Sequence, residues 1–138
     1  MSVEMHAQQQ GLTTQLTHGP SGTALRTVPP KDNGGDASSF SPTDLVGAAL
    51  AACAVTTMVL IAKRENLPLG DPRARVVKVM TMTGPRRIAE LTLHIDMPPG
   101  TRPEHRARLE EIARTCPVAR SLHPELKIPL SFAYPAAP

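Results

Sequence analysis

The sequence predicts an α+β domain in which the elements follow the order strand, strand, helix, strand, strand, helix, strand. One long uncharged run, residues 45–62, has the length and composition of a helix buried on most of its sides. Apolar and polar side chains alternate in two other stretches, residues 73–83 and 88–97, as they do in strands with one solvent-exposed face. We expect the whole chain, residues 1–138, to form a single domain.

The N-terminal part of the chain is predicted to form a small antiparallel sheet. Residues 1–18 hold two short segments rich in threonine and glutamine, and residues 19–22 (Gly-Pro-Ser-Gly) are a strong turn signal. Residues 23–28 then read as the returning strand of a hairpin. The loop that follows, residues 29–39, is long enough to indicate a functional or interface role.

The long helix has clear signals at both ends. Ser41 suits the N-cap, Pro42 the first helical position, and the Asp44 carboxylate can accept bonds from the unpaired amides of the first turn. The helix should end near residue 65, before Pro68. Small residues share one of its faces and predict close approach of another backbone, as in a tightly crossed helix pair: Gly47, Ala48, Ala51, Ala52 and Thr56.

The C-terminal half predicts a hairpin, a second helix and a last strand. Gly84 and Pro85 separate the two alternating stretches. Thr101 is the expected cap of the second helix, which the pair Cys116-Pro117 ends or redirects. Residues 127–134 are the predicted last strand.

Composition narrows the class of protein. The formal net charge of +3 is small, and the basic residues are scattered along the chain. Only three aromatic side chains are available to stack on bases, so we do not expect nucleic-acid binding. The uncharged run contains threonines and many alanines, so we do not expect a membrane span. No signal peptide is evident, and two cysteines do not make a secreted disulfide scaffold, so we expect the reducing cytoplasm.

Most common chemical motifs are missing from the sequence. The five histidines show no ligand spacing, so we expect no metal site. The DNGGD segment is a turn and lacks the Lys-Ser/Thr of a phosphate-binding loop, and no serine has the context of a nucleophile elbow. The two cysteines remain as the candidates for chemistry.

Local context leaves both cysteines open to an inert or a reactive reading. Cys53 lies about eleven residues into the predicted helix, beyond the reach of the helix dipole, so an acidic thiol there needs a cation or a hydrogen-bond donor from elsewhere in the fold. Cys116 lies near a helix C-terminus, which disfavours a thiolate. If Pro117 instead opens a new short helix, Cys116 lies at an N-terminus and the argument reverses.

Two motifs resemble those of a known family. SPTDLVGAALAAC, reaching Cys53, resembles the central motif of the OsmC/Ohr family of osmotically induced and organic hydroperoxide resistance proteins. CPVARSLHPEL, starting at Cys116, is similar to the second cysteine region of the family. HGPSGTALRT, with DNGG before SPTDL, is similar to one OsmC-like branch, and the resemblance extends from about residue 18 to the end of the chain.

The resemblance implies an obligate, intertwined homodimer in which antiparallel sheets wrap around two central helices. It also implies a thiol-dependent peroxidase that reduces organic hydroperoxides in oxidative stress defence. Cys53 would be the peroxidatic cysteine and Cys116 the resolving one, with a sulfenic acid and then a disulfide as intermediates. No bound cofactor is expected, and a dithiol such as a dihydrolipoyl protein would act as external reductant.

The sequence departs from the active members at two positions. Those enzymes carry a glutamate ten positions before the first cysteine, where this chain has Thr43, and Asp44 is shifted by one residue, or about 100° around a helix. They pair that glutamate with an arginine of the N-terminal hairpin, where His18 and then Arg26 are the nearest counterparts. The alternatives are therefore an OsmC-like stress protein without peroxidase activity that binds a small apolar ligand at the dimer interface, or a structural dimer module with inert thiols.

Overall fold

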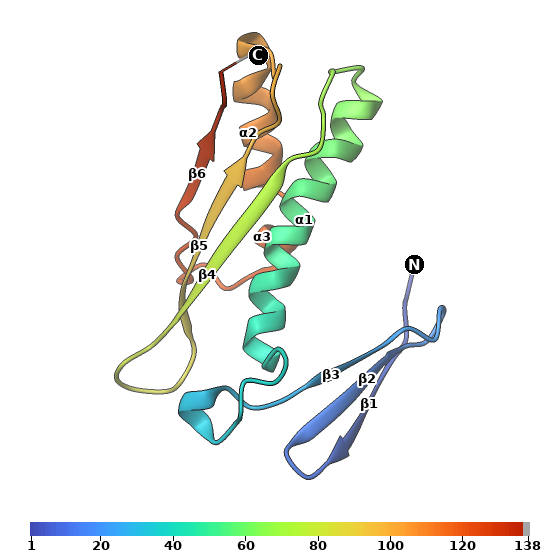
Figure 1. Cartoon of the computed structure of the whole chain (residues 1–138), viewed down its shortest axis with the longest axis vertical. Coiled ribbons are helices and arrows are strands. Elements are labelled where there is room, and N and C mark those ends of the chain that lie inside the picture. The colour runs from blue at the N-terminus through green and yellow to red at the C-terminus, as the bar shows by residue number, and fades with distance from the viewer. Residues whose placement is uncertain (137–138) are drawn as a thin grey trace. The chain divides into compact units, whose positions relative to one another are not determined.

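The computed structural model describes residues 1–136 and confirms the α+β class, with six strands and three α-helices among those residues (Figure 1). The chain divides into two compact units between Val46 and Gly47, inside the long helix. The first unit contains one three-stranded sheet, and the second contains another, together with most of the helical residues.

The first unit is built on an antiparallel sheet with the strand order β1-β2-β3. The strands are β1 (Met5–Gln10), β2 (Thr13–His18) and β3 (Ala24–Thr27), which confirms the predicted strand, turn and returning strand. The turn after β2 closes through the amide of Gly22, which donates to the His18 carbonyl at 2.8 Å. Gly22 has φ +72°, a left-handed conformation that glycine adopts without steric cost.

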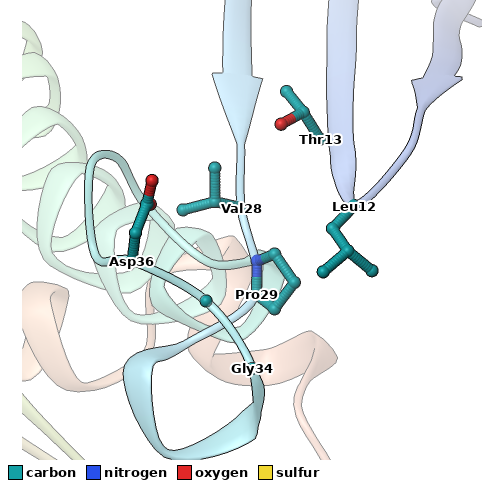
Figure 2. Close-up of a pocket in the computed structure, with 7 residues that line it drawn as sticks. Leu12, Thr13, Val28, Pro29, Gly34 and Asp36 are labelled. Carbon is teal, nitrogen blue, oxygen red and sulfur yellow. The ribbon is translucent and has the colours of Figure 1, made fainter.

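The predicted loop after β3 contains a short 3₁₀ helix, η1 (Lys31–Asn33). Gly35 is packed so closely that a side-chain Cβ there would lie 1.6 Å from the Pro29 carbonyl oxygen. The base of the loop is closed by the Val28 amide, which donates to the Phe40 carbonyl at 3.0 Å. Figure 2 shows the pocket of about 200 Å³ that this loop forms with the turn between β1 and β2.

The long helix, α1 (Pro42–Arg64), has the predicted boundaries. Its start is a reciprocal capping box: the Ser41 hydroxyl accepts a bond from the Asp44 amide at 3.1 Å, and the Asp44 carboxylate accepts one from the Ser41 amide at 2.8 Å. Its end is marked by Asn66, which has φ +56° in the left-handed region where helices commonly terminate. By length and composition α1 could also cross a membrane, as the core helices of many soluble proteins could.

The second unit contains a mixed sheet with the order β4-β5-β6. Strands β4 (Arg73–Met80) and β5 (Ile88–Asp96) pair antiparallel, as predicted, with a bulge between Val79 and Met80. Strand β6 (Leu130–Ala133) lies within the predicted last strand but is parallel to β5, so this one pairing differs from the all-antiparallel arrangement that we expected.

The core of the second unit lies on one face of this sheet. Leu91, Leu93 and Ile95 of β5 are almost completely buried, and α1 contributes Gly47 to the same core. An added Cβ at Gly47 would lie 3.3 Å from a Leu91 methyl group. The small residue at the start of the helix therefore accommodates side chains of the sheet, and close approach of another backbone at the remaining small residues stays a prediction.

Two shorter helices follow β5: α2 (Arg106–Arg114) and α3 (Pro117–Ser121). The prediction that Thr101 caps the second helix is wrong, because a 3₁₀ turn, η2 (Pro103–His105), precedes α2. The Thr101 hydroxyl instead donates to the Pro98 carbonyl at 2.8 Å and stabilises the preceding proline-rich turn.

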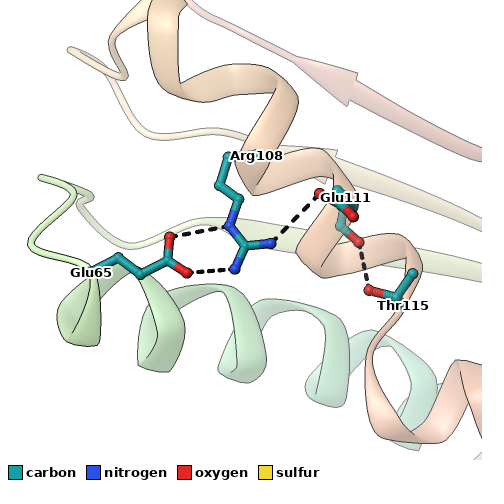
Figure 3. Close-up of polar contacts among 4 residues, drawn as sticks. All are labelled: Glu65, Arg108, Glu111 and Thr115. Atoms are coloured by element: carbon teal, nitrogen blue, oxygen red, sulfur yellow. Dashed lines mark hydrogen bonds and ion pairs between the residues drawn. The ribbon is translucent and has the colours of Figure 1, made fainter.

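An ion-pair cluster links α2 to the end of α1 (Figure 3). The Arg108 guanidinium donates to both carboxylate oxygens of Glu65, which lies directly after α1. The third nitrogen of the same guanidinium lies 3.5 Å from a carboxylate oxygen of Glu111, one turn further along α2. Two parallel bonds from a planar guanidinium fix geometry better than a single ion pair does.

Candidate functional site

Cys53 lies in the middle of α1 and is partly exposed. Its sulfur accepts a hydrogen bond from the backbone amide of Val118, at 3.5 Å, and lies 3.7 Å from the hydroxyl oxygen of Thr57. Thr57 is four residues further along the helix, so the two side chains share one face. Val118 belongs to the first turn of α3, where amides have no partner within the helix and are available to an acceptor outside it.

Cys116 is the N-cap residue of α3, with φ −62° and ψ 156°, and its side chain is completely buried. Of the two placements that the sequence left open, the structure confirms the second, because Pro117 begins a new helix. Pro117 suits this position since its fixed φ matches the helix and its missing amide hydrogen would have no partner there. Both thiols are free in the structure.

Hydrogen bonding gives Cys53 the more acidic thiol. Its burial alone would raise its pKa, but the Val118 amide, the Thr57 hydroxyl and the Cys116 thiol together outweigh burial and hold the pKa of Cys53 below its ordinary value. Each of these donors stabilises the thiolate more than the thiol. The hydrogen-bond donor that Cys53 was predicted to need from elsewhere in the fold is thus the backbone amide of Val118, and the Thr57 hydroxyl of the same helix adds a second contact.

The pKa of Cys116 is shifted in the opposite direction. Burial is the largest cause that raises it, and the hydrogen bond and the charge of the neighbouring Cys53 raise it further, against a weaker opposing contribution from the Ala119 amide. A negative charge on Cys53 makes a second one on Cys116 unfavourable. The site therefore combines a partly exposed, acidic thiol with a buried thiol that stays protonated beside it.

The other predicted site residues all lie in the first unit. The His18 ring nitrogen Nδ1 lies 2.6 Å from the Ser21 hydroxyl, and the Arg26 guanidinium donates to the Ser38 hydroxyl at 3.4 Å. Thr43 and Asp44 occupy the first turn of α1, where the Asp44 carboxylate takes part in the capping box. The capping role predicted for Asp44 is confirmed.

Sequence reasoning missed two contributors to the site, Thr57 and Val118. Thr57 carries a detectable signal, because a hydroxyl four residues after a helical cysteine faces the same way. Val118 carries none by itself, since its side chain is not the group involved. Its role depends on Pro117 opening a helix, which the sequence presented as one of two possibilities.

An α+β chain with two three-stranded sheets and an acidic thiol held against a second, buried one defines a small dithiol protein. This chain belongs to the OsmC-like protein family, whose family model matches residues 34–131. Some solved structures that share its fold are named organic hydroperoxide resistance proteins. No curated protein matched the chain.

Solved structures support the same family. A protein from Psychrobacter arcticus, described as an osmotic stress induced and detoxification response protein, is 32% identical, with 94% of each chain covered and a TM-score of 0.86. The organic hydroperoxide resistance protein OsmC of Legionella pneumophila is 18% identical, with 96% of this chain and 97% of that chain covered and a TM-score of 0.79. The organic hydroperoxide resistance protein OhrB of Bacillus subtilis is 18% identical, with 96% and 98% covered and a TM-score of 0.71. The last two establish a shared fold.

Proposed function

We propose that this protein is a thiol-dependent peroxidase that reduces organic hydroperoxides, with Cys53 as the attacking and Cys116 as the resolving cysteine. The observation that carries the proposal is the opposite environment of two neighbouring thiols. The amide of Val118 and the hydroxyl of Thr57 favour a thiolate at Cys53, while burial disfavours one at Cys116. Only the thiolate is a strong nucleophile, so the two thiols have different roles.

In the first step the Cys53 thiolate attacks the terminal oxygen of the hydroperoxide, and the O–O bond breaks. The sulfur gains that hydroxyl and becomes a sulfenic acid. The other oxygen leaves with the bonding electron pair as an alkoxide and takes up a proton from solvent to become the alcohol. The partial exposure of Cys53 is consistent with access of a small substrate to the sulfur.

In the second step the sulfur of Cys116 attacks the sulfenic sulfur of Cys53. An S–S bond forms, the S–O bond breaks, and the hydroxide leaves as water with the proton of the Cys116 thiol. The mutual influence of the two thiols on their pKa values supports this step, because it is the behaviour of groups that lie close together. Burial of Cys116 protects it from direct oxidation, so it reacts only once Cys53 has become electrophilic.

Return to the dithiol state requires an external reductant. A dithiol, such as a dihydrolipoyl group, attacks the disulfide, transfers two electrons and leaves oxidised as its own cyclic disulfide, while both cysteines regain their protons. The protein needs no bound cofactor in this cycle. The proposal places the protein in the cytoplasm, where such dithiols are kept reduced.

We further propose that the protein acts as a homodimer. Helix α1 is strongly apolar, yet only 28% of its 18-residue apolar stretch is buried within one chain. Val59 and Leu60, near its C-terminal end, are 38% and 45% exposed. Exposed apolar side chains on an apolar helix are consistent with an interface, and a second copy would cover them.

Consumption of cumene hydroperoxide tests the peroxidase proposal. The full chain should consume it catalytically with dihydrolipoamide as reductant, and more slowly with a monothiol. Cys53→Ser should abolish consumption with either reductant. Cys116→Ser should lose turnover with dihydrolipoamide while still forming a sulfenic acid on Cys53. Activity that survives Cys53→Ser would overturn the assignment.

Two observations favour the second candidate function, an OsmC-like stress protein that binds a small apolar ligand and lacks peroxidase activity. The Asp44 carboxylate is committed to the helix cap, and Thr43 stands where active members carry a glutamate. Native mass spectrometry of freshly purified protein separates the two functions. A co-purified apolar molecule, combined with unchanged thiols under hydroperoxide, would support the second.

A further inference from the structure

A histidine on the outer face of the second sheet lies between a carboxylate and a serine. His94 of β5 has its Nδ1 atom 2.7 Å from the Ser131 hydroxyl of β6 and its Nε2 atom 3.1 Å from the Asp96 carboxylate of β5. The pairing of β5 with β6 brings the two side chains together, because His94 and Ser131 are register partners. Asp96 is two residues beyond His94 and therefore projects from the same face of the strand.

These contacts assign the proton on the imidazole ring. An ionised carboxylate can only accept a hydrogen bond, so the Asp96 contact places the ring hydrogen on Nε2. In the neutral imidazole, Nδ1 then carries a lone pair to which the Ser131 hydroxyl can donate. A serine, a base that accepts its proton and a carboxylate that orients the base are the three parts of an activated hydroxyl nucleophile.

The surroundings of this triad are polar and positively charged. Arg75 and Arg73 of β4 are the register partners of His94 and Asp96, and both are exposed. Cross-strand partners have side chains within reach of one another on the same face. The His94 ring is 28% exposed and the Asp96 side chain 59% exposed, so the imidazole is held in place while Ser131, also exposed, is open to a reagent.

We propose that Ser131 is a site of covalent acyl modification by activated carboxylic esters, independent of the thiol chemistry of the protein. The Ser131 oxygen attacks the ester carbonyl while its proton passes to Nδ1 of His94. The bond to the leaving alcohol or phenol then breaks, and the leaving group takes the proton from His94. The product is an ester on Ser131 and a free alcohol or phenol, with no oxidation or reduction.

Because Ser131 is exposed, we expect it to be acylated once and to remain modified, and not to act as an esterase with many turnovers. Ser131 lies on an open sheet face, where solvent screens the charges that would stabilise a tetrahedral intermediate. Activated esters, which carry a good leaving group, need little such stabilisation. Hydrolysis of the acyl-serine needs more stabilisation of its tetrahedral intermediate, so the acyl-serine should persist.

The chain contains its own control for the role of the carboxylate. His18 and Ser21 of the first unit are also within hydrogen-bond distance, at 2.6 Å. The Ser21 hydroxyl, however, donates to Thr23 at 2.9 Å, and within the described part of the chain no carboxylate bonds to the His18 ring. Ser21 is therefore an exposed serine next to a histidine that lacks an orienting carboxylate.

Incubation of the full chain with p-nitrophenyl acetate, followed by peptide mapping of acetyl groups over time, tests this proposal. We expect Ser131 to be acetylated at least tenfold faster than Ser21. His94→Gln should slow acetylation of Ser131 by about 10²-fold, the scale of a lost general base. Asp96→Asn should slow it less, and neither change should affect Ser21 or the thermal midpoint substantially.

Ser131→Ala identifies the modified atom, because it should remove the acetyl group from that peptide and leave labelling of lysines unchanged. Equal labelling of Ser131 and Ser21 would overturn the proposal, as would a Ser131 rate that is indifferent to His94→Gln. Either result would show that the three residues are an ordinary polar row on a solvated sheet. Peroxidase activity is not measured in this experiment, so the two proposals fail separately.

Discussion

The backbone amide of Val118 donates a hydrogen bond to the sulfur of Cys53 across 3.5 Å and 65 positions of sequence. This contact joins the middle of α1 to the first turn of α3, whose N-cap is the other cysteine. One short helix therefore contributes to the environment of both thiols: its first-turn amide bonds to the sulfur of Cys53, and its N-cap residue is Cys116.

The Thr57 hydroxyl makes a separable contribution to the acidity of Cys53. Thr57→Val keeps the shape of the side chain and removes the donor, so the pKa of Cys53 should rise. A hydrogen bond to a charged group is worth about 1.5 kcal/mol, so alkylation of Cys53 by iodoacetamide at neutral pH should slow about tenfold. Thr56→Val, at the exposed neighbouring position, is the control and should leave the rate unchanged. Equal effects of both substitutions would exclude the hydroxyl as a cause.

The ion pair between Glu65 and Arg108 should make stability depend on pH. The Arg108 guanidinium holds the pKa of Glu65 below its ordinary value, so the pair stabilises the folded state above the unfolded pKa of Glu65 and the effect is lost as the pH falls through the folded pKa. Arg108→Gln should lower the thermal midpoint at neutral pH, and its difference from the parent should vanish in acid.

Arg102→Gln is the matched control for that measurement. In the parent chain Arg102 lies 4.0 Å from Glu104, further than Arg108 lies from Glu65, and both side chains are 62% exposed. The substitution should have little effect at any pH, since such exposed pairs contribute little. A difference between Arg108→Gln and the parent that persists undiminished in acid would contradict the role assigned to Glu65.

Gly47 tests the packing of α1 against the sheet. Alanine at this position adds one carbon, 3.3 Å from a Leu91 methyl group that can rotate, and gains helix propensity worth about 1 kcal/mol, so Gly47→Ala should be close to neutral. Gly47→Val adds two more carbons to a filled core and should lower the free energy of unfolding by about 1–3 kcal/mol. Urea denaturation measures both, and equal stability of the two variants would show that the core has spare room there.

Tyr134, which follows β6, is predicted to tie that segment to α2. Its hydroxyl donates to the Glu110 carboxylate at 2.8 Å, and the Arg106 guanidinium lies 4.1 Å from the centre of its ring. Tyr134→Phe should lower the free energy of unfolding by about 1 kcal/mol, the usual net value of a hydrogen bond. Tyr134→Leu should cost more because it also removes the cation–π contact. If the Tyr134→Phe and Tyr134→Leu variants are equally stable, the contact between the ring and Arg106 contributes nothing to stability.

Local signals in the sequence were sufficient to predict most of the fold. Capping by Ser41 and Asp44, the turn ending at Gly22 and the alternation along β4 and β5 each depend on neighbouring residues, and the structure confirms them. The parallel direction of β6 was not predictable in this way. It is set by where the chain returns after α2 and α3, which is a tertiary property.

The candidate site was predictable in its residues but less so in its chemistry. Both cysteines stand in motifs that resemble those of a known family, and membership is now established. The source of the acidity of Cys53 depends on a backbone amide brought from a distant segment, and a sequence pattern cannot reveal such a contact. Thr101 shows the opposite failure, because a good local capping signal was overridden by a 3₁₀ turn that starts after it.

Intact mass and free-thiol measurement after brief exposure to one equivalent of organic hydroperoxide is the decisive test of whether Cys53 and Cys116 form a redox pair. We expect the loss of two hydrogens and of both thiols within seconds, with Cys53→Ser inert and Cys116→Ser trapped as a sulfenic acid on Cys53. Unchanged mass and two remaining thiols under excess hydroperoxide would contradict it.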